Sequence, residues 1–171
     1  ASELQVYRQA HEPLLKHLND EWSRRSPSVP YKTPYEPLIM ASIIEKETGK
    51  PSERPLIAGV YCNRLKIGMK LDADPTVIYP VTKGKPLGRR IKKSELEASN
   101  DYNTYTRAGL PAGPIANPGK ASIEAVLHPA LTKALYFVAD GTGGHAFADT
   151  LAEQNANVAK WYAIRRQRGQ M

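Results

Sequence analysis

The segment YEPLIMASIIEKETG, residues 35–49, decides the fold. Its spacing predicts a helix, because Met40, Ile43, Ile44 and Glu47 fall on one face when each residue advances the helix by about 100°. A carboxyl therefore stands where an apolar stripe should continue. The stripe predicts that the side chain of Glu47 points toward the interior or into a cleft.

The expected ends of this helix place Glu47 in its last turn. Residues 33–36 form a capping box with proline at the first helical position, and Gly49 suits the helix end. The helix dipole and partial burial both disfavour a carboxylate there, so both should raise the pKa of Glu47 toward the range of a general acid. Glu45 is expected to face water. Two interpretations of Glu47 stay open: a buried glutamate paired with an arginine, or a catalytic acid.

Composition indicates one globular domain, and we expect no metal or organic cofactor. The chain has 171 residues, of which 41% are hydrophobic, and it contains no apolar run of membrane-spanning length and no secretory signal. A single cysteine, Cys62, excludes an internal disulfide and thiolate-rich metal sites, and the four histidines lack ligand spacing. Because Ala1 is not an initiator methionine, we expect a piece of a longer precursor.

The charge balance favours an anionic partner. Lys and Arg number 24 against 17 Asp and Glu, a net charge of +7. The basic residues gather in residues 83–93 and 165–168, without the interleaved aromatics that stack nucleic-acid bases. We therefore expect two solvated charge runs, the first in a loop and the second at the end of a helix, and no nucleic-acid partner.

The N-terminal half reads as helical. Residues 3–24 have helical spacing that Pro13 should kink or divide. Ser52 can cap a helix running to about Lys66 and closed by Gly68, with Asn63 at the end of its apolar stripe.

The C-terminal half adds shorter elements and a hairpin. Asp74-Pro75 opens a short helix through Tyr79, residues 98–119 form a long loop rich in turn formers, and Asn117-Pro118 begins a helix that ends before Pro129. Residues 135–139 and 145–148 predict two strands joined by a glycine-rich turn, and Thr150 begins a helix with a capping box. The predicted class is α+β: a mostly helical single domain with a small antiparallel sheet.

Several motifs in this order carry a family resemblance: ASIIEKETG, ERPLIAGVYCNRLKIGMKLDADPTVIY, YNTY, GLPAGPIANPG, LHPA and LYFVADGTGGHAF. Over residues 33–160 the chain resembles the catalytic domain of the endolytic murein transglycosylases, the MltG or YceG-like family. The resemblance implies an N-terminal helical segment over residues 1–32 and a catalytic domain over residues 33–171. Family members typically carry a membrane helix and a LysM-like module before this domain, and neither is present in this sequence.

The resemblance implies cleavage of the β-1,4 bond between N-acetylmuramic acid and N-acetylglucosamine in nascent peptidoglycan, leaving 1,6-anhydromuramyl ends. It also implies that Glu47, the second acid of EKET, is the catalytic residue, placed on a helix as in lysozymes. A hydrolase would need a second acid about 5 to 9.5 Å away, for which Asp74 and Glu53 are candidates. We expect Asp74 to be a helix cap at the cleft and Glu53 an ion-pair partner in the fold.

Neutral amides and hydroxyls in the matched motifs suit sugar recognition, because they bond hydroxyl and N-acetyl groups without burying a charge. We expect the loop 100–119 to form one wall of a groove whose floor carries Glu47, with Asn63 reaching the same region. The expected substrate-binding residues are Asn63, Asp74, Thr76, Tyr79, Asn103, Tyr105, Asn117 and His145.

By resemblance, the native protein is expected at the periplasmic face of the bacterial inner membrane. Its expected partners are glycan strands and cell-wall synthesis proteins. The membrane is expected to be reached only through a segment missing from this soluble piece. Three alternatives stay open: a non-catalytic peptidoglycan-binding module, a hydrolytic muramidase, and a nucleic-acid-binding domain supported only by the net charge.

Overall fold

The computed structural model describes residues 3–47 and 50–170, with side chains from residue 12 onward. The helices and strands, in chain order, are α1 (Glu3–Ser23), α2 (Tyr35–Glu47), the 3-10 turn η1 (Pro51–Glu53), α3 (Arg54–Ile67), α4 (Asp74–Thr82), α5 (Lys93–Leu96), α6 (Lys120–Leu127), β1 (Tyr136–Ala139), β2 (His145–Ala148) and α7 (Leu151–Gln167).

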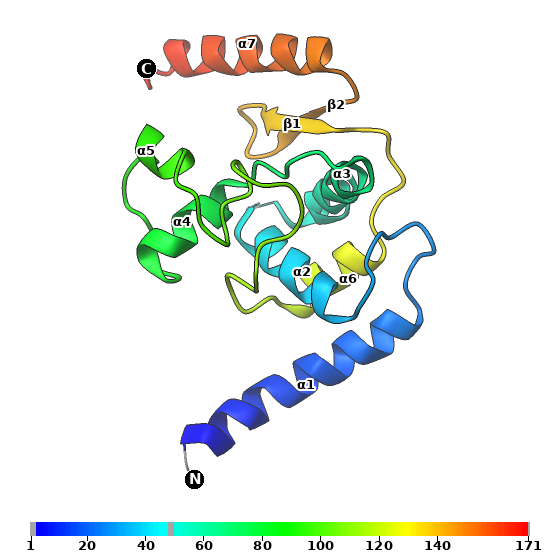
Figure 1. Ribbon diagram of the computed structural model, residues 1–171. Coiled ribbons are helices and arrows are strands. Elements are labelled where there is room, and N and C mark those ends of the chain that lie inside the picture. The colour runs from blue at the N-terminus through cyan, green and yellow to red at the C-terminus, as the bar shows by residue number, and fades with distance from the viewer. Residues whose placement is uncertain (1–2, 48–49, 171) are drawn as a thin grey trace.

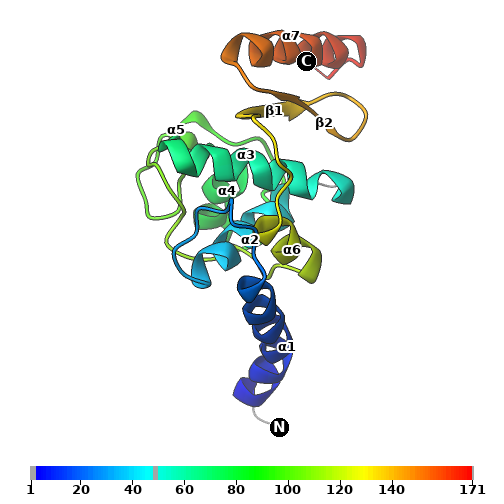
Figure 2. The same ribbon diagram turned by 90° about the vertical axis from the view of Figure 1, so that its right-hand side faces the viewer.

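The elements are arranged along one long axis. A helical body of α2, α3, α4 and α6 lies in the middle, α1 extends from one end, and the β1–β2 hairpin with α7 covers the other (Figures 1 and 2). The hairpin is antiparallel, with Tyr136 opposite Ala148 and Ala139 opposite His145. The predicted class, mostly helical α+β with a small antiparallel sheet, is confirmed.

Helix α2 is the centre of the core and is buried on more than one face. Every residue from Ile39 to Ile44 is buried, which is more than one full helical turn. Its neighbours are α3, α4 and α6, so the single apolar stripe expected from the sequence was too narrow. Met40, Ile43 and Ile44 are fully buried, and burying a side chain of this size contributes about 1.5–3 kcal/mol.

Helix α1 is one helix across Pro13, so of the two expected effects, a kink or a division, the division is wrong. Its second half packs on the body through Leu18, which is buried, and Glu21, whose carboxyl lies 2.9 Å from His128 Nε2. In the described part of the chain, no helix is both long and apolar enough to cross a bilayer.

The starts of α3 and α4 differ from the expectation. Ser52 does not cap α3, because η1 precedes that helix and Glu53 occupies the cap position. Gly68 ends α3 in the left-handed region, φ 73°, as expected. Helix α4 begins at Asp74 as predicted but continues through Pro80 to Thr82.

The C-terminal elements follow the prediction closely. The hairpin and the helix after Thr150 are confirmed, and the Thr150 hydroxyl accepts a hydrogen bond from the backbone N–H of Glu153. Helix α6 ends at Leu127, before Pro129 as expected, but it begins at Lys120 with Gly119 at the cap position, so the expected start at Asn117-Pro118 was wrong. The expected helix end at Gly49 lies outside the described residues.

Candidate active site

The carboxyl of Glu47 lies on the wall of a cavity of about 410 Å³. The end of α2, the start of α4, one face of α3 and strand β1 surround this cavity, which we call the Glu47 cavity. Its ionisable and hydroxyl-bearing side chains are Glu47, Tyr61, Arg64, Asp72, Asp74, Tyr105, Tyr136 and His145.

Glu47 accepts a hydrogen bond from the hydroxyl of Tyr61, at 2.9 Å between the oxygens. Burial of the Glu47 carboxyl, the largest cause, raises its pKa from 4.5 to about 7. The Tyr61 bond lowers the pKa, the charge of Asp74 raises it and the charge of Arg64 lowers it. Because the pKa lies near neutral, the carboxyl can both give and take a proton at physiological pH.

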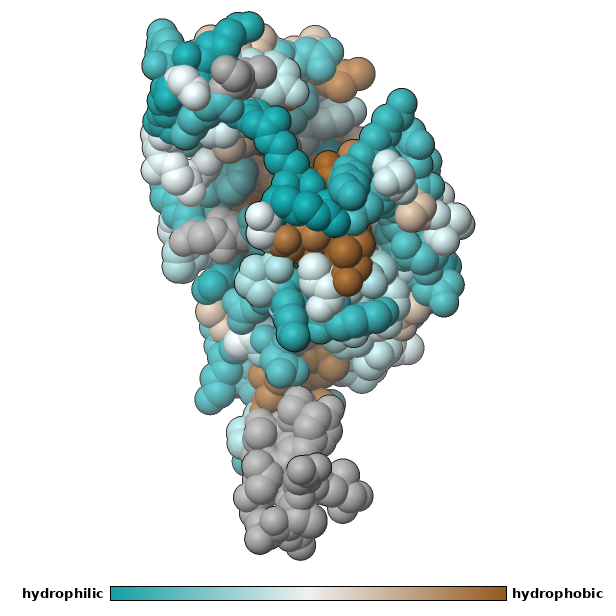
Figure 3. Space-filling model, turned by 90° about the vertical axis from the view of Figure 1, so that its left-hand side faces the viewer, coloured by the Kyte–Doolittle hydropathy of each residue, from teal (hydrophilic) through white to brown (hydrophobic). Residues whose placement is uncertain are grey.

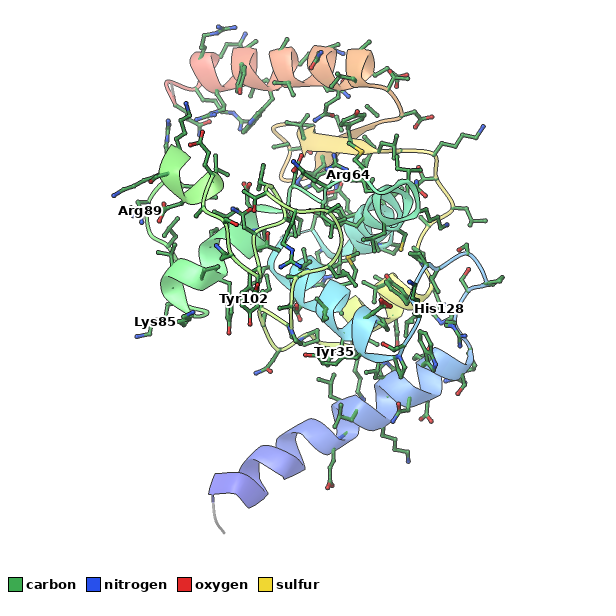
Figure 4. All side chains as sticks on the ribbon, viewed as in Figure 1. Tyr35, Arg64, Lys85, Arg89, Tyr102 and His128 are labelled. Carbon is green, nitrogen blue, oxygen red and sulfur yellow. The ribbon has the colours of Figure 1, made fainter. Side chains whose placement is uncertain are left out.

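Arg64 lies beside the cavity but bonds mainly to backbone. Its Nε donates to the carbonyl of Leu135 at 2.7 Å, and its Nη1 donates to the carbonyls of Lys70 and Leu71 at 3.1 and 3.0 Å. Figure 4 shows the Arg64 side chain between α3 and the hairpin. Among the described residues no cation forms an ion pair with Glu47, so the first interpretation, a glutamate paired with an arginine, does not hold.

Asp74 is the first residue of α4, and its side chain does not cap the helix, because Ala73 holds the cap position. Instead, Asp74 Oδ1 accepts a short hydrogen bond from the hydroxyl of Tyr105. Burial and this carboxylate raise the pKa of Tyr105 far above its ordinary range, so the phenol stays protonated. The expected capping role is corrected: Asp74 joins α4 to the loop 98–119 at the cavity.

His145, which lines the same cavity, forms a hydrogen-bonded pair with Glu53, which does not. Glu53 is 8% exposed; Oε2 accepts from the backbone N–H of His145, and Oε1 lies 3.0 Å from His145 Nδ1. A Cβ on Gly144 would lie 3.1 Å from Glu53 Oε2, so only glycine allows this approach without a shift. The pair orients the imidazole, because Glu53 holds one of its two ring nitrogens.

Comparisons with known proteins identify the family of this chain. The sequence profile of the YceG-like family matches residues 1–160. The chain belongs to the YceG-like family. It is 44% identical over 131 residues to a protein of Bacillus subtilis (strain 168) named endolytic murein transglycosylase, covering 77% of this chain and 36% of that relative.

Two further family members extend the comparison. A relative of the same name from Streptococcus pneumoniae (serotype 2, strain D39) is 37% identical over 131 residues, covering 73% of this chain and 23% of the relative. A crystal structure of a YceG-like protein from Listeria monocytogenes superposes with a TM-score of 0.75 at 37% identity, over 86% of this chain and 46% of that one. The chain thus spans less than half of each of these three relatives.

Three of the expected substrate-binding residues line the Glu47 cavity: Asp74, Tyr105 and His145. They come from α4, from the loop after α5 and from β2, which are far apart in the sequence. Of the loop 100–119, Tyr105 is the one residue that lines the Glu47 cavity, so this loop forms less of the wall than the sequence suggested.

Three others bond inside the protein instead. The Asn63 amide donates to the carbonyls of Thr132 and Ala134, at 2.8 and 3.0 Å, on another side of α3. Thr76 and Asn103 are 0% exposed. The Asn103 amide donates to carbonyls at and just after the end of α5, and the Thr76 hydroxyl contacts that of Thr104 at 2.8 Å.

The remaining two, Tyr79 and Asn117, line a different and larger hollow of about 650 Å³. This hollow lies between α1, α2 and the end of α4. The expected single groove is therefore divided in the structure, with the Glu47 cavity on one side of the α2 end and this hollow on the other.

Sequence reasoning missed Tyr61 and Arg64, although a signal was available. Ile57, Tyr61 and Arg64 are spaced by four and three residues on α3, so two polar groups continue an apolar stripe, as Glu47 does on α2. Within the described residues, no three side chains of His, Cys, Asp or Glu gather closely enough to hold a metal ion.

Proposed function

We propose that this domain is an endolytic lytic transglycosylase that cleaves the β-1,4 bond after N-acetylmuramic acid in nascent glycan strands. The observation that carries the proposal is the partly buried carboxyl of Glu47, whose pKa of about 7 suits both proton donation and proton acceptance. The names of the Bacillus and Streptococcus relatives support the reaction class.

In the first step the protonated carboxyl of Glu47 gives its proton to the glycosidic oxygen, and the bond from that oxygen to the anomeric carbon breaks. The N-acetylglucosamine portion leaves as an alcohol. Tyr61 holds one carboxyl oxygen of Glu47, so the other oxygen is the one directed to the substrate. The cationic character that develops at the anomeric carbon is offset by the carboxylate left on Glu47.

In the second step the C6 hydroxyl of the muramyl residue attacks the anomeric carbon, and the Glu47 carboxylate takes the hydroxyl proton. A 1,6-anhydro ring forms, no water is consumed, and Glu47 is protonated again. One carboxyl thus acts as acid and then as base.

A hydrolytic muramidase is the second candidate, favoured by the position of Asp74 in the same cavity. A paired carboxylate could activate water or act as a nucleophile. We prefer the transglycosylase because one Asp74 oxygen is already occupied by the Tyr105 hydroxyl, and Glu53 is occupied by His145. A purely glycan-binding module has no use for the acid in this setting.

We assign glycan contacts to Asp74, Tyr105 and His145, which line the Glu47 cavity. We place the native protein at the periplasmic face of the inner membrane, held there by a segment outside this chain. Support for such a segment is the greater length of the relatives, of which the chain spans 23–36%.

Mass analysis of the products from purified peptidoglycan tests the reaction. Transglycosylation yields muramyl ends lighter by one water than hydrolytic ends. If the fragments carry only reducing ends, the muramidase is correct and Asp74 becomes its partner acid.

A further inference from the structure

The larger hollow beside α2 continues into a second one. The hollow of about 650 Å³ and a neighbouring hollow of about 240 Å³ share Lys46, Tyr79, Gly84 and Ile115 in their walls. Together they form one trough, which we call the lysine groove. Figure 3 faces this side of the molecule and shows apolar surface set among hydrophilic side chains.

The floor of the lysine groove is apolar and its rim is cationic. Leu14 and Leu38 line one end, and Ile78 and Leu87 line the other. The cations on its walls are Lys46, Lys83 and Lys85, all exposed. Figure 4 labels Lys85 near the end of α4.

The acid in this trough is already occupied. Glu45 accepts from the backbone N–H of Gly119 at 2.6 Å and lies 3.5 Å from Arg54 Nη2. No acid of the described residues pairs with Lys46, Lys83 or Lys85 within 4.0 Å. The groove therefore presents uncompensated positive charge above an apolar floor, which complements a ligand with carboxylates and small apolar groups.

The groove adjoins the Glu47 cavity through two helix ends. At the end of α2, Glu47 lines the cavity and the preceding Lys46 lines the groove. At the start of α4, Asp74 lines the cavity and the following Pro75 lines the groove. The two hollows lie on different sides of the α2 end, because the side chains of Lys46 and Glu47 leave the helix about 100° apart, so a substituent on a sugar bound at Glu47 must pass around this helix end to reach Lys46.

We infer that the lysine groove binds the stem peptide carried by the muramyl residue, a substrate contact that rests on the proposed function. Such a peptide is short, has small apolar side chains and ends in free carboxylates. Lysines act as point charges for carboxylates without fixing one geometry. A hollow of about 650 Å³ is within the usual size range for a small-ligand site.

A comparison of two substrates tests the inference. Glycan strands with intact stem peptides, and the same strands freed of peptide by an amidase, are given to the wild-type chain and to a triple variant, Lys46→Gln, Lys83→Gln and Lys85→Gln. We expect the wild type to prefer peptide-bearing glycan and the triple variant to lose roughly fivefold to tenfold of that preference in kcat/KM. A matched variant with the same charge change outside the groove, Lys93→Gln, Lys133→Gln and Lys160→Gln, should keep the wild-type ratio.

A binding measurement separates this inference from the proposed function. Free stem peptide titrated into the wild-type chain by calorimetry should bind in a salt-sensitive manner, and binding should weaken in the triple variant and with peptide whose carboxylates are amidated. If glycan is cleaved but the ratio and the peptide affinity are the same in the triple variant, the inference is overturned while the function stands. If no glycan is cleaved but peptide binding still depends on the three lysines, the proposed function fails and the groove assignment survives.

Discussion

Two glutamates in the last turn of α2, only two residues apart, have opposite surroundings. Glu45 is bonded through both oxygens: the Gly119 N–H donates to Oε1, while the Ser122 hydroxyl and Arg54 reach Oε2. The sequence placed Glu45 toward water, but its side chain is only 26% exposed and fastens α2 to the start of α6. A carboxylate near a helix N-terminus is also favoured by the helix dipole.

Glu47 has one neutral donor, the Tyr61 hydroxyl, and a second carboxylate nearby, Asp74. Burial is the main reason that the pKa of Glu47 rises to about 7, and the charge of Asp74 adds to the rise. We infer from this contrast that the carboxylate of Glu45 serves the fold and that Glu47 is the carboxyl available for chemistry.

The largest expected effect is on catalysis. Glu47→Gln keeps the shape of the side chain but removes the titrating proton, so glycan cleavage should fall by at least ~10²-fold. Glu45→Gln is the matched control and should change the rate far less in folded protein. Release of muramyl products from peptidoglycan measures both; a folded Glu47→Gln chain with full activity would remove Glu47 from the mechanism.

The next effect is on stability, with opposite signs at the two sites. The native pKa of Glu47 lies above its ordinary 4.5, so the native state keeps its proton to higher pH than the unfolded state, and stability falls as pH rises from about 4.5 to about 7. Glu47→Gln removes that loss and should stabilise the chain by about 1–3 kcal/mol at pH 8, with no gain at pH 4. Glu45→Gln should destabilise it by about 1 kcal/mol at pH 8, because a charge-assisted bond becomes neutral.

Urea unfolding at pH 4 and pH 8 measures these differences. If both substitutions change the free energy of unfolding in the same direction at pH 8, the two carboxyls do not differ as described.

The smallest effect concerns the pH at which activity declines. Loss of the Glu47 proton should lower kcat/KM above about pH 7. Asp74→Asn removes a charge that raises the Glu47 pKa and should move this decline to lower pH, whereas Tyr61→Phe removes a bond that lowers the pKa and should move it to higher pH, each by about 0.5 to 1 pH unit. Profiles of kcat/KM from pH 5 to 9 compare the wild type with the two variants. If both variants move the decline in the same direction, another group is responsible for it.

The sequence was most informative where local rules decide the outcome. Gly68 closes α3, Thr150 caps α7, and the glycine-rich turn sets the hairpin, because each depends on residues within a few positions. The same local reasoning predicted that the Glu47 side chain points into a cleft, and the structure places it on a cavity wall.

The sequence was least informative where distant segments meet. Asn63 looked suited to sugars, yet its amide donates to carbonyls 69 and 71 residues along the chain. Asn103 likewise fills its donor capacity with backbone around the end of α5. An amide that binds a sugar and one that satisfies a buried carbonyl have the same local sequence pattern, and only the tertiary fold distinguishes them.

Arg64 has a further consequence for how substrate is received. Its guanidinium bonds three carbonyls from two segments, one before α4 and one before β1, and these segments flank the Glu47 cavity. The two walls are therefore braced against each other by the protein itself, and little conformational entropy should remain to be lost when a glycan enters. The cavity is therefore preformed, and Arg64→Lys, which lacks the rigid planar fork, should loosen the contact between its two walls.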